Sequence, residues 1–528
     1  MERIDGNGVS RRWFIGGLGS LGALGGCRAF CAPTGQCVSG RPNLVFGVVS
    51  DVHMRIAADG NGLAAGYDTQ TLEHALSWFR DQGVDAVMIP GDLADSGLLP
   101  ELEAVAAAWF KVFPNDRAPD GRHVERLFVY GNHDWNGWVY SKRAETIFTN
   151  EAERRRNMVG LDQKGNWERV FHEPFSLVWR KEVKGYSFVG AHWTKEHCIG
   201  SSLADEKGIQ GVREFFAQTA AFDPSRPFFY FQHPHLKNTC YGPWAWGHDN
   251  GEAPQVLSAY PNAVAISGHS HYTLTDERSI WQGAFTALGA SSLRYTGLPY
   301  NSCPPAGYEN TIAPKPWRTE VDPYKAMPAL GAGSTQDGRQ GMLVRVYDDR
   351  IVFVRREFVY DQSLGDDWVV PLAAAAPRPF DFAVRATQVP APAFPPDATL
   401  SVRKVRGKIR GGKGVKGAVP SAETDVYELS FPGANARKGA RVLEYVIRIE
   451  GKDGSRVEKR LLAEDFHLPA SRLDAKAACT CRIAAAQLPA GASHVFSVLP
   501  VGSLGRLGTA LSARAEFCAT RCMVAKPL

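Results

Sequence analysis

The stretch NLVFGVVSDVH, residues 43–53, is an apolar run that ends in Asp51 and His53. An apolar run of this length is typical of a strand that is buried on both faces of a sheet. The carboxylate and the imidazole stand two residues apart, so in an extended segment both side chains point to the same side. The stretch therefore predicts a buried strand that delivers two polar groups to one place.

Four further segments repeat this pattern of an apolar run followed by Asp, Asn or His. They are VDAVMIPGDLAD (84–95), VERLFVYGNHD (124–134), PFFYFQHPH (227–235) and AVAISGHSH (263–271). Helical patterns lie between them, such as TLEHALSWFRDQG with Leu72, Leu76 and Phe79 on one face, and LLPELEAVAAAWFKVF at 98–113. Alternating strands and helices predict a largely parallel α/β sheet, in which ligands bind at the carboxyl ends of the strands.

The strand ends collect seven side chains that are able to bind metal ions. They are Asp51, His53, Asp92, Asn132, His233, His269 and His271. Seven mixed nitrogen and oxygen donors are too many for one tetrahedral zinc ion, and they suit two adjacent ions that share a carboxylate. Imidazole together with carboxylate favours manganese, iron or zinc over calcium or magnesium. Two such ions can clamp the attacking and leaving oxygens of a displacement at phosphorus.

The chain resembles the calcineurin-like metallophosphoesterase superfamily in five motifs and in their order. The motifs are DVH at 51–53, GDLAD at 91–95, GNHD at 131–134, His233 within QHPH, and GHSH at 268–271. The resemblance implies a metallophosphoesterase α/β sandwich domain over residues 41–362. It also implies one metal on Asp51, His53, Asp92 and His271, and a second on Asp92, Asn132, His233 and His269.

The same resemblance implies roles for two residues beside the metals. His133 would stabilise the phosphoryl oxygens and protonate the leaving group, while a metal-bridging hydroxide attacks phosphorus directly. Asp95 matches the carboxylate that orients this histidine in several members. Purple acid phosphatases have glycine at the position of His53 and tyrosine at that of Asp95, and protein phosphatases have arginine at that of Ser96. The histidine-rich pattern is closer to bacterial phosphodiesterases, so we expect a dinuclear-metal phosphodiesterase.

Several alternatives stay open. A phosphomonoesterase would carry the same five motifs. A cell-surface binding protein with structural metals is an alternative of another class, although such a site has no use for a proton donor at His133. A nuclease is a third alternative, but the net charge of +5 is small for 528 residues, and no nucleic-acid partner is expected.

Two further histidines are candidates for contact with the substrate. His192 ends the apolar run in YSFVGAHW, and His235 ends the fourth motif. Between the two histidines of QHPH, we predict that His233 is the metal ligand, because it comes first after the apolar run FFYFQ.

The first 40 residues are predicted to be an export signal. SRRWFIG, residues 10–16, places two arginines before an apolar, glycine-rich stretch and resembles a twin-arginine signal. LGGC, residues 24–27, resembles a bacterial lipobox, which predicts lipidation of Cys27 and anchoring to a membrane. The alternative is an ordinary signal peptide that is cleaved further along. We therefore expect a periplasmic or cell-envelope protein, and the sequence indicates no oligomeric state.

The remainder of the chain has a different character. Residues 363–397 are rich in Pro and Ala and are predicted to be a linker. Residues 398–528 contain short strand-like segments separated by Gly and Pro turns. This pattern predicts a C-terminal all-β sandwich, similar to a fibronectin type III module.

Overall fold

A computed structural model describes the chain from residue 40 to residue 527 except for several segments. The segments left out are 59–62, 66, 140–142, 195–207, 243–246, 298–333, 336–337, 374–377, 408–422, 435–440, 464–465, 470–477, 492 and 517–525. The chain divides into two compact units, Met1–Gly40 and Arg41–Leu528. The predicted export signal and Cys27 lie outside the described residues.

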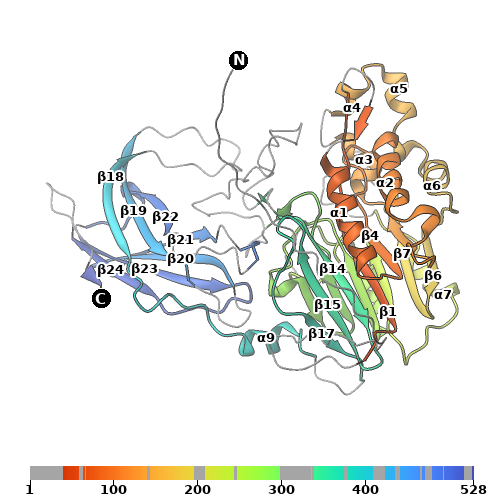
Figure 1. Cartoon of the computed structure of the whole chain (residues 1–528). Coiled ribbons are helices and arrows are strands. Elements are labelled where there is room, and N and C mark those ends of the chain that lie inside the picture. The colour runs from red at the N-terminus through yellow and green to blue at the C-terminus, as the bar shows by residue number, and fades with distance from the viewer. Residues whose placement is uncertain are drawn as a thin grey trace, which may run out of the picture. The chain divides into compact units, whose positions relative to one another are not determined.

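The first domain is built on two mixed sheets (Figure 1). The first sheet consists of β1 (Leu44–Val48), β4 (Ala86–Pro90), β5 (Glu125–Val129), β14 (Gln340–Val346), β15 (Arg350–Glu357), β16 (Gln362–Ser363) and β17 (Trp368–Pro371). The strand order is β16-β15-β14-β1-β4-β5, and β17 also pairs with β15. Strands β1, β4 and β5 are parallel, whereas β14 to β17 pair antiparallel.

The second sheet has the order β10-β11-β9-β8-β7-β6. Its strands are β6 (Val178–Val183), β7 (Tyr186–Ala191), β8 (Phe228–Gln232), β9 (Ala263–Ser267), β10 (Ile280–Gln282) and β11 (Thr286–Gly289). The central strands β7, β8, β9 and β11 are parallel, and the edge strands β6 and β10 are antiparallel. The predicted α/β architecture is confirmed, with the parallel strands shared between two mixed sheets.

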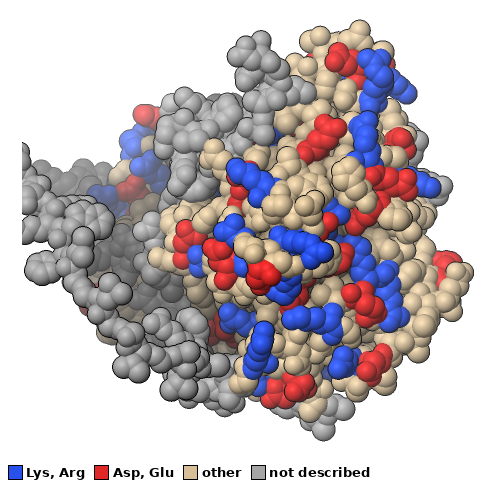
Figure 2. Space-filling model, turned by 45° about the vertical axis from the view of Figure 1, so that its right-hand side comes forward, with Lys and Arg blue, Asp and Glu red and all other residues tan. Residues whose placement is uncertain are grey.

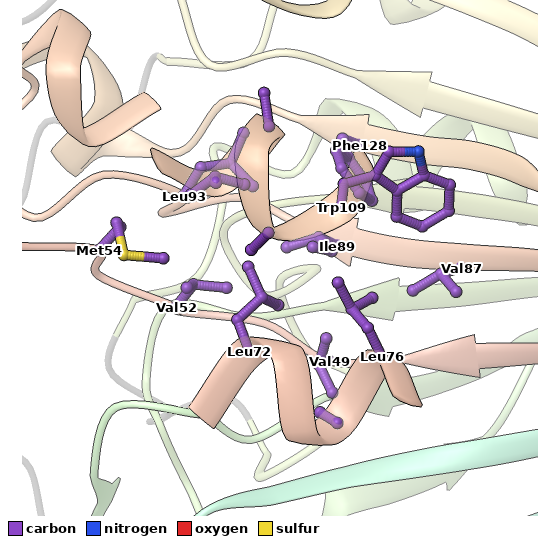
Figure 3. Close-up of a cluster of buried hydrophobic side chains, with 14 of the residues drawn as sticks. Val49, Val52, Met54, Leu72, Leu76, Val87, Ile89, Leu93, Trp109 and Phe128 are labelled. Atoms are coloured by element: carbon purple, nitrogen blue, oxygen red, sulfur yellow. The ribbon is translucent and has the colours of Figure 1, made fainter. Parts of the chain in front are cut away.

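Helices cover the outer faces of both sheets. They are α1 (Tyr67–Asp81), α2 (Leu99–Val112) and α6 (Gln163–Phe171) on the first sheet, and α7 (Val212–Gln218) and α8 (Glu252–Leu257) on the second. Leu72 and Leu76 of α1 pack in one buried cluster with Val87 and Ile89 of β4, as the helical spacing predicts (Figure 3). The order of layers is therefore helix, sheet, sheet, helix.

The two sheets pack face to face through aromatic side chains. The ring of Phe46 in β1 lies 5.2 Å from that of Phe188 in β7 and 4.8 Å from that of Phe229 in β8, measured between centroids. All three side chains are buried in one hydrophobic cluster. Because both faces of the central strands are covered, β4, β8 and β9 are buried at every residue, which explains their unbroken apolar runs.

The second domain is all-β. Its first sheet has the order β18 (Ser401–Gly407), β19 (Thr424–Pro432), β22 (Ala478–Ala484). Its second sheet has the order β21 (Arg456–Leu462), β20 (Val442–Gly451), β23 (Ser493–Gly502), β24 (Leu511–Glu516), β25 (Lys526–Pro527). Phe431 of β19 lies 5.0 Å from Tyr445 of β20 between ring centroids, inside a core that both sheets share. This arrangement agrees with the predicted β-sandwich, and its fibronectin-like type stays a prediction.

The predicted linker at 363–397 begins too early. Strand β17, Trp368–Pro371, pairs with β15, so the first sheet continues beyond residue 362. Phe380 is buried in the cluster between the two sheets of the first domain. It is followed by helix α9 (Phe382–Gln388). A Pro- and Ala-rich composition predicts an extended linker, but Trp368, Val370 and Phe380 within it are buried in the cluster between the two sheets.

Smaller elements complete the described chain. They are the ribbons β2 (Ile56–Ala58) with β3 (Leu63–Ala65) and β12 (Thr296–Gly297) with β13 (Ser334–Thr335), and the helices α3 (Asn132–Asn136), α4 (Arg143–Ile147) and α5 (Glu151–Arg156). Figure 2 shows Lys and Arg interspersed with Asp and Glu over one face of the molecule. None of the helices in the described part of the chain has both the length and the hydrophobicity needed to cross a bilayer.

Glu357, at the end of β15, makes the stability of the fold dependent on pH. Burial raises the pKa of its carboxyl to about 8, although N–H groups of Val359 and Arg339 favour the ionised form. The unfolded chain releases this proton near pH 4.5. The native state therefore holds more protons between these two values, and the free energy of unfolding falls as the pH rises from about 4.5 to about 8.

Replacement of Glu357 by glutamine is expected to remove this dependence, because the amide reproduces the neutral acid. The Tm of Glu357→Gln should match the wild-type Tm at pH 4.5 and exceed it by roughly 5 °C at pH 8. Thermal unfolding at a series of pH values checks this expectation. A constant difference between the two proteins across the series would contradict it.

Candidate metal centre

The seven predicted ligands come together at the carboxyl ends of five parallel strands. Asp51 and His53 follow β1, Asp92 follows β4, Asn132 begins α3 after β5, His233 follows β8, and His269 and His271 follow β9. Each of the seven is at most 7% exposed. The convergence follows from the topology, because parallel strands end at the same edge of a sheet and the two sheets are packed against each other.

The first group of ligand atoms belongs to Asp51, His53, Asp92 and His271, which lie within 4.8 Å of one another. His271 Nε2 is 3.0 Å from Asp51 Oδ1, and His53 Nε2 is 3.4 Å from Asp92 Oδ2. The Nε2 atoms of the two histidines are only 3.1 Å apart. This group is the predicted ligand set of the first metal.

The second group belongs to Asp92, His233 and His269, again within 4.8 Å. His233 Nε2 lies 3.1 Å from Asp92 Oδ2 and 3.1 Å from His269 Nδ1. Asn132 is buried beside this group, since the N–H of the next residue, His133, donates to Asp92 Oδ1 at 2.8 Å. Asp92 is common to both groups, as a bridging carboxylate must be.

Hydrogen bonds to the outer nitrogens determine which histidine atoms can bind a metal. His53 Nδ1 donates to Asp95 Oδ1 at 3.2 Å, His233 Nδ1 to Pro90 O at 2.8 Å, and His271 Nδ1 to Tyr295 O at 3.1 Å. Carboxylate and carbonyl oxygens only accept, so Nδ1 carries a proton, and in the neutral ring Nε2 keeps the lone pair that can bind a metal. Lone pairs of this kind then face one another and the carboxylates, an arrangement that fits bound cations.

The charges of the buried groups agree with such a site. Burial opposes ionisation of Asp51 and Asp92, but the adjacent histidines outweigh it and lower the pKa of Asp51 to about 2 and that of Asp92 well below its usual range. Burial also opposes the charge of His233, yet Asp92 raises the pKa of His233 to about 9. Burial lowers the pKa values of His53 and His269. The site therefore offers ionised carboxylates at Asp51 and Asp92 and neutral imidazoles at His53 and His269, while His233 is protonated beside Asp92 and would give up that proton to a bound cation.

The backbone at the ligands is strained. Five of them have left-handed φ angles between 45° and 73°, namely Asp51, His53, Asp92, His269 and His271. Such a conformation costs a residue other than glycine roughly 1–2 kcal/mol, and it is concentrated at functional sites. A Cβ on Gly131 would lie 2.2 Å from Asp92 Oδ1, and one on Gly268 would lie 2.5 Å from Asp51 Oδ2. Glycine is required at these two positions because the ligands approach the backbone so closely.

Three partly exposed side chains adjoin the buried ligands: His133, Asp95 and Tyr295. The ring of His133 lies 4.4 Å from that of His53, between centroids. His133 Nδ1 donates to the main-chain oxygen of Asp95 at 2.6 Å. The carboxylate of Asp95 accepts from His53. The carbonyl of Asp95 therefore holds His133, and its carboxylate holds a metal ligand. The same carboxylate lies within 4.8 Å of a ring nitrogen of His133, and its role in orienting this histidine stays a prediction.

The two histidines predicted to contact substrate do not reach the site. His192 is 1% exposed, and its Nδ1 and Nε2 lie 3.0 Å from Tyr130 N and 3.1 Å from Trp179 Nε1. His235 is also 1% exposed, with both nitrogens on serine hydroxyls. Burial lowers the pKa of each to about 3. Both predictions are wrong, because these rings are neutral parts of the interior.

Two residues near the ligands were missed by the sequence analysis. Trp193 lies 5.9 Å from His269 and 6.3 Å from His233, between ring centroids. It directly follows His192, and neighbouring residues of an extended segment face opposite sides, so the prediction was one residue off. The ring of Tyr295 lies 4.0 Å from that of His271. The segment SSLRYTG has no feature that would have indicated this contact.

Comparison with known proteins gives a family for this domain. The sequence profile of the family described as calcineurin-like phosphoesterase matches residues 44–273. Among curated proteins, no sequence matches significantly. The most similar solved structures include a dimetal phosphatase from Danio rerio, with 12% identity, a TM-score of 0.34, and coverage of 63% of this chain and 100% of that one. They also include a purple acid phosphatase from yellow lupin (Lupinus luteus) seeds, with 13% identity and a TM-score of 0.36. This match covers 63% of this chain and 55% of that one.

The α/β sandwich carries a group of buried carboxylates and imidazoles that could hold metal ions. Residues 44–273 form a calcineurin-like phosphoesterase domain, which is that of a metallophosphoesterase, that is, of a phosphoric ester hydrolase. The residues present fit two metal ions, with Asp92 common to both groups.

Replacing Asp95 by alanine is expected to weaken metal binding by about 10- to 100-fold, because the variant lacks the acceptor that fixes the tautomer of His53. The main-chain carbonyl that holds His133 remains. The loss of rate should therefore be the same for good and poor leaving groups. Calorimetric titration with manganese and hydrolysis of two substrates check this. If metal affinity is unchanged and the rate falls only for poor leaving groups, the Asp95 carboxylate acts through His133 and not through His53.

Proposed function

We propose that this metallophosphoesterase is a phosphodiesterase that uses two metal ions from the set manganese, iron and zinc. The observation that carries the proposal is Asp92, whose Oδ2 lies 3.4 Å from His53 Nε2 and 3.1 Å from His233 Nε2. One carboxylate thus serves two groups of ligand atoms. Imidazole and carboxylate donors together suit these metals.

The metal ligands and His133 have different roles in the proposed reaction. When bound, two metal ions would polarise the phosphoryl oxygens and lower the pKa of the water that attacks phosphorus. His133 is partly exposed beside His53, and its Nδ1 is held by the carbonyl of Asp95. In the imidazolium form, with Nδ1–H held by that carbonyl, the proton on Nε2 would be donated to the leaving oxygen. The buried ligands would hold the metals.

Among the described residues, the carboxylate of Asp95 beside the site favours a diester over a monoester. A monoester dianion carries one more negative charge than a diester and gains more from neighbouring cations. Asp95, next to His133, is a carboxylate, and Ser96 is buried, with its N–H donating to Glu101. Arg55 donates to Asp68 in a buried pair and is directed at that carboxylate. Phosphomonoesterase activity is the second candidate.

The test compares hydrolysis of a 4-nitrophenyl phosphomonoester with that of the bis-ester by the full chain carrying Cys27→Ala, which removes the position predicted to be lipidated. The protein is loaded with manganese, zinc or iron, and a chelator-treated sample serves as the control. We expect metal-dependent turnover, faster with the bis-ester. Faster turnover of the monoester would make the protein a phosphatase. Two firmly bound metals without turnover of either ester would favour a cell-surface binding protein with structural metals.

Export and anchoring are a separate proposal that rests on SRRWFIG and LGGC in the first 40 residues. In a bacterial host with a twin-arginine pathway, the full chain should appear in the membrane fraction on the outer side of the inner membrane. Replacement of both Arg11 and Arg12 by lysine should keep the protein in the cytoplasm. Cys27→Ala should release it as a soluble exported protein, and an unchanged membrane fraction would exclude the lipid anchor.

A further inference from the structure

His235, which does not reach the substrate, occupies a buried place between two serines of the next strand and loop. Its Nδ1 lies 2.8 Å from Ser267 Oγ, and its Nε2 lies 2.5 Å from Ser270 Oγ. Ser267 is the last residue of β9, and Ser270 stands between the ligands His269 and His271. The imidazole thus joins the end of a rigid strand to the middle of the ligand loop.

The hydrogen bonds from His235 to the two serines have one consistent direction, and Cys240 Sγ lies 3.7 Å from the same Nδ1. Ser267 donates its hydroxyl proton to Leu288 O at 3.3 Å, so its oxygen accepts from His235 Nδ1. The lone pair on Nε2 then accepts from the hydroxyl of Ser270, whose oxygen accepts from the N–H of Tyr272 at 3.3 Å. The hydroxyls of Ser267 and Ser270 and the Nδ1–H of His235 thus each have an acceptor. A neutral imidazole suits it, because one ring nitrogen must donate and the other accept.

The loop that carries Ser270 is strained on both sides of it. His269 has φ = 73° and His271 has φ = 58°, so both ligands occupy the left-handed region. Left to itself, a chain of such residues would relax toward the right-handed or extended regions. Residues in such conformations persist where the surroundings fix them. The hydroxyl of Ser270 is a contact that can fix this loop.

We infer that His235 is a positioning residue which, through Ser270, holds His269 and His271 in the conformation that binds metal. It contacts neither metal nor substrate. The inference rests on the proposed binding of metals by the two ligands. It explains why a second histidine follows the ligand His233 two residues later. His233 would bind the metal of the second group, and His235 would hold the loop that carries Ser270.

The test measures manganese affinity by calorimetric titration of the metal-free full chain carrying Cys27→Ala, with Tm recorded for each protein. His235→Ala and Ser270→Ala should each weaken manganese binding by about 10- to 100-fold. The double variant should lose no more than the larger single loss, since the two changes remove one interaction. His235→Gln, which keeps an acceptor for the hydroxyl of Ser270, should recover part of the affinity.

A matched control is His494→Ala in β23, another buried histidine, whose Nε2 donates to Pro489 O. This variant should have a lower Tm and unchanged manganese affinity. If His235→Ala does not fold, Ser270→Ala decides the question, because it removes a single hydroxyl. Lower Tm with unchanged affinity in the Ser270 variant would overturn the role of His235. A wild-type chain that binds no manganese, zinc or iron would overturn the proposed function together with this inference.

Discussion

The Asp92→Asn variant is expected to hydrolyse phosphoesters at least about 10³-fold more slowly than the wild-type protein, because metal stabilisation of the transition state is worth several kcal/mol. Asp92 is the carboxylate common to both groups of ligand atoms. An amide keeps the shape of the side chain and can still accept from the N–H of His133. It lacks the negative charge and the second oxygen that a bridge between two cations requires. Metal analysis should find no more than one ion per chain.

Asp85→Asn is the matched control for this variant. Asp85 is buried just before β4, whereas Asp92 follows the end of the same strand. Its carboxylate accepts from Val45 N at 2.9 Å and pairs with Lys184. The control should have a lower Tm, bind two metal ions and keep its activity below that temperature. Full activity of Asp92→Asn with one metal per chain would show that the reaction does not need the bridge.

The His133→Ala variant is expected to lose about 10²- to 10⁴-fold in kcat on a diester with an alkyl leaving group. A 4-nitrophenyl leaving group needs little protonation, so the loss on that substrate should be much smaller. His133 lies beside the ligand His53 and belongs to neither of the two groups that share Asp92, so the metal content should not change. Rates on the two substrates and metal analysis of the purified variant provide the measurement.

His123→Ala serves as the control, because His123 is an exposed histidine that pairs with Glu125 on the surface. It should leave both rates unchanged. An equal loss of rate on both substrates for His133→Ala would remove the role of proton donor and leave only stabilisation of the phosphoryl oxygens. Loss of a metal ion would place His133 among the ligands.

The ligand positions could be predicted because each stands at the end of an unbroken apolar run. Such a run identifies a strand buried on both faces, and parallel strands bring their carboxyl ends to one edge. The apolar segment ending in Asp51 and His53 is β1, and that ending in His269 and His271 begins with β9. The two lie in different sheets. Sequence pattern predicted that the ligands meet, without showing that two sheets carry them.

The surroundings of the ligands could not be predicted. His192 and Trp193 are neighbours, and only the register of β7 decides that the histidine enters the interior while the tryptophan adjoins the ligands. In the same way, Asp95 offers a carboxylate and a carbonyl to two different histidines. The choice depends on side-chain direction in a loop, for which the sequence has no periodicity.

The sequence by itself determined the class of fold, the ligands and the chemistry that they favour. These depend on hydrophobic periodicity and on donor type, which are properties of short segments. Only the tertiary structure decided the supporting contacts, such as His235 on Ser270 and Tyr295 beside His271. These pairs are far apart in the chain, and each contact exists because the packing of two sheets fixes the distance between their loops. Local pattern determines which groups reach the edge, and packing determines what they touch there.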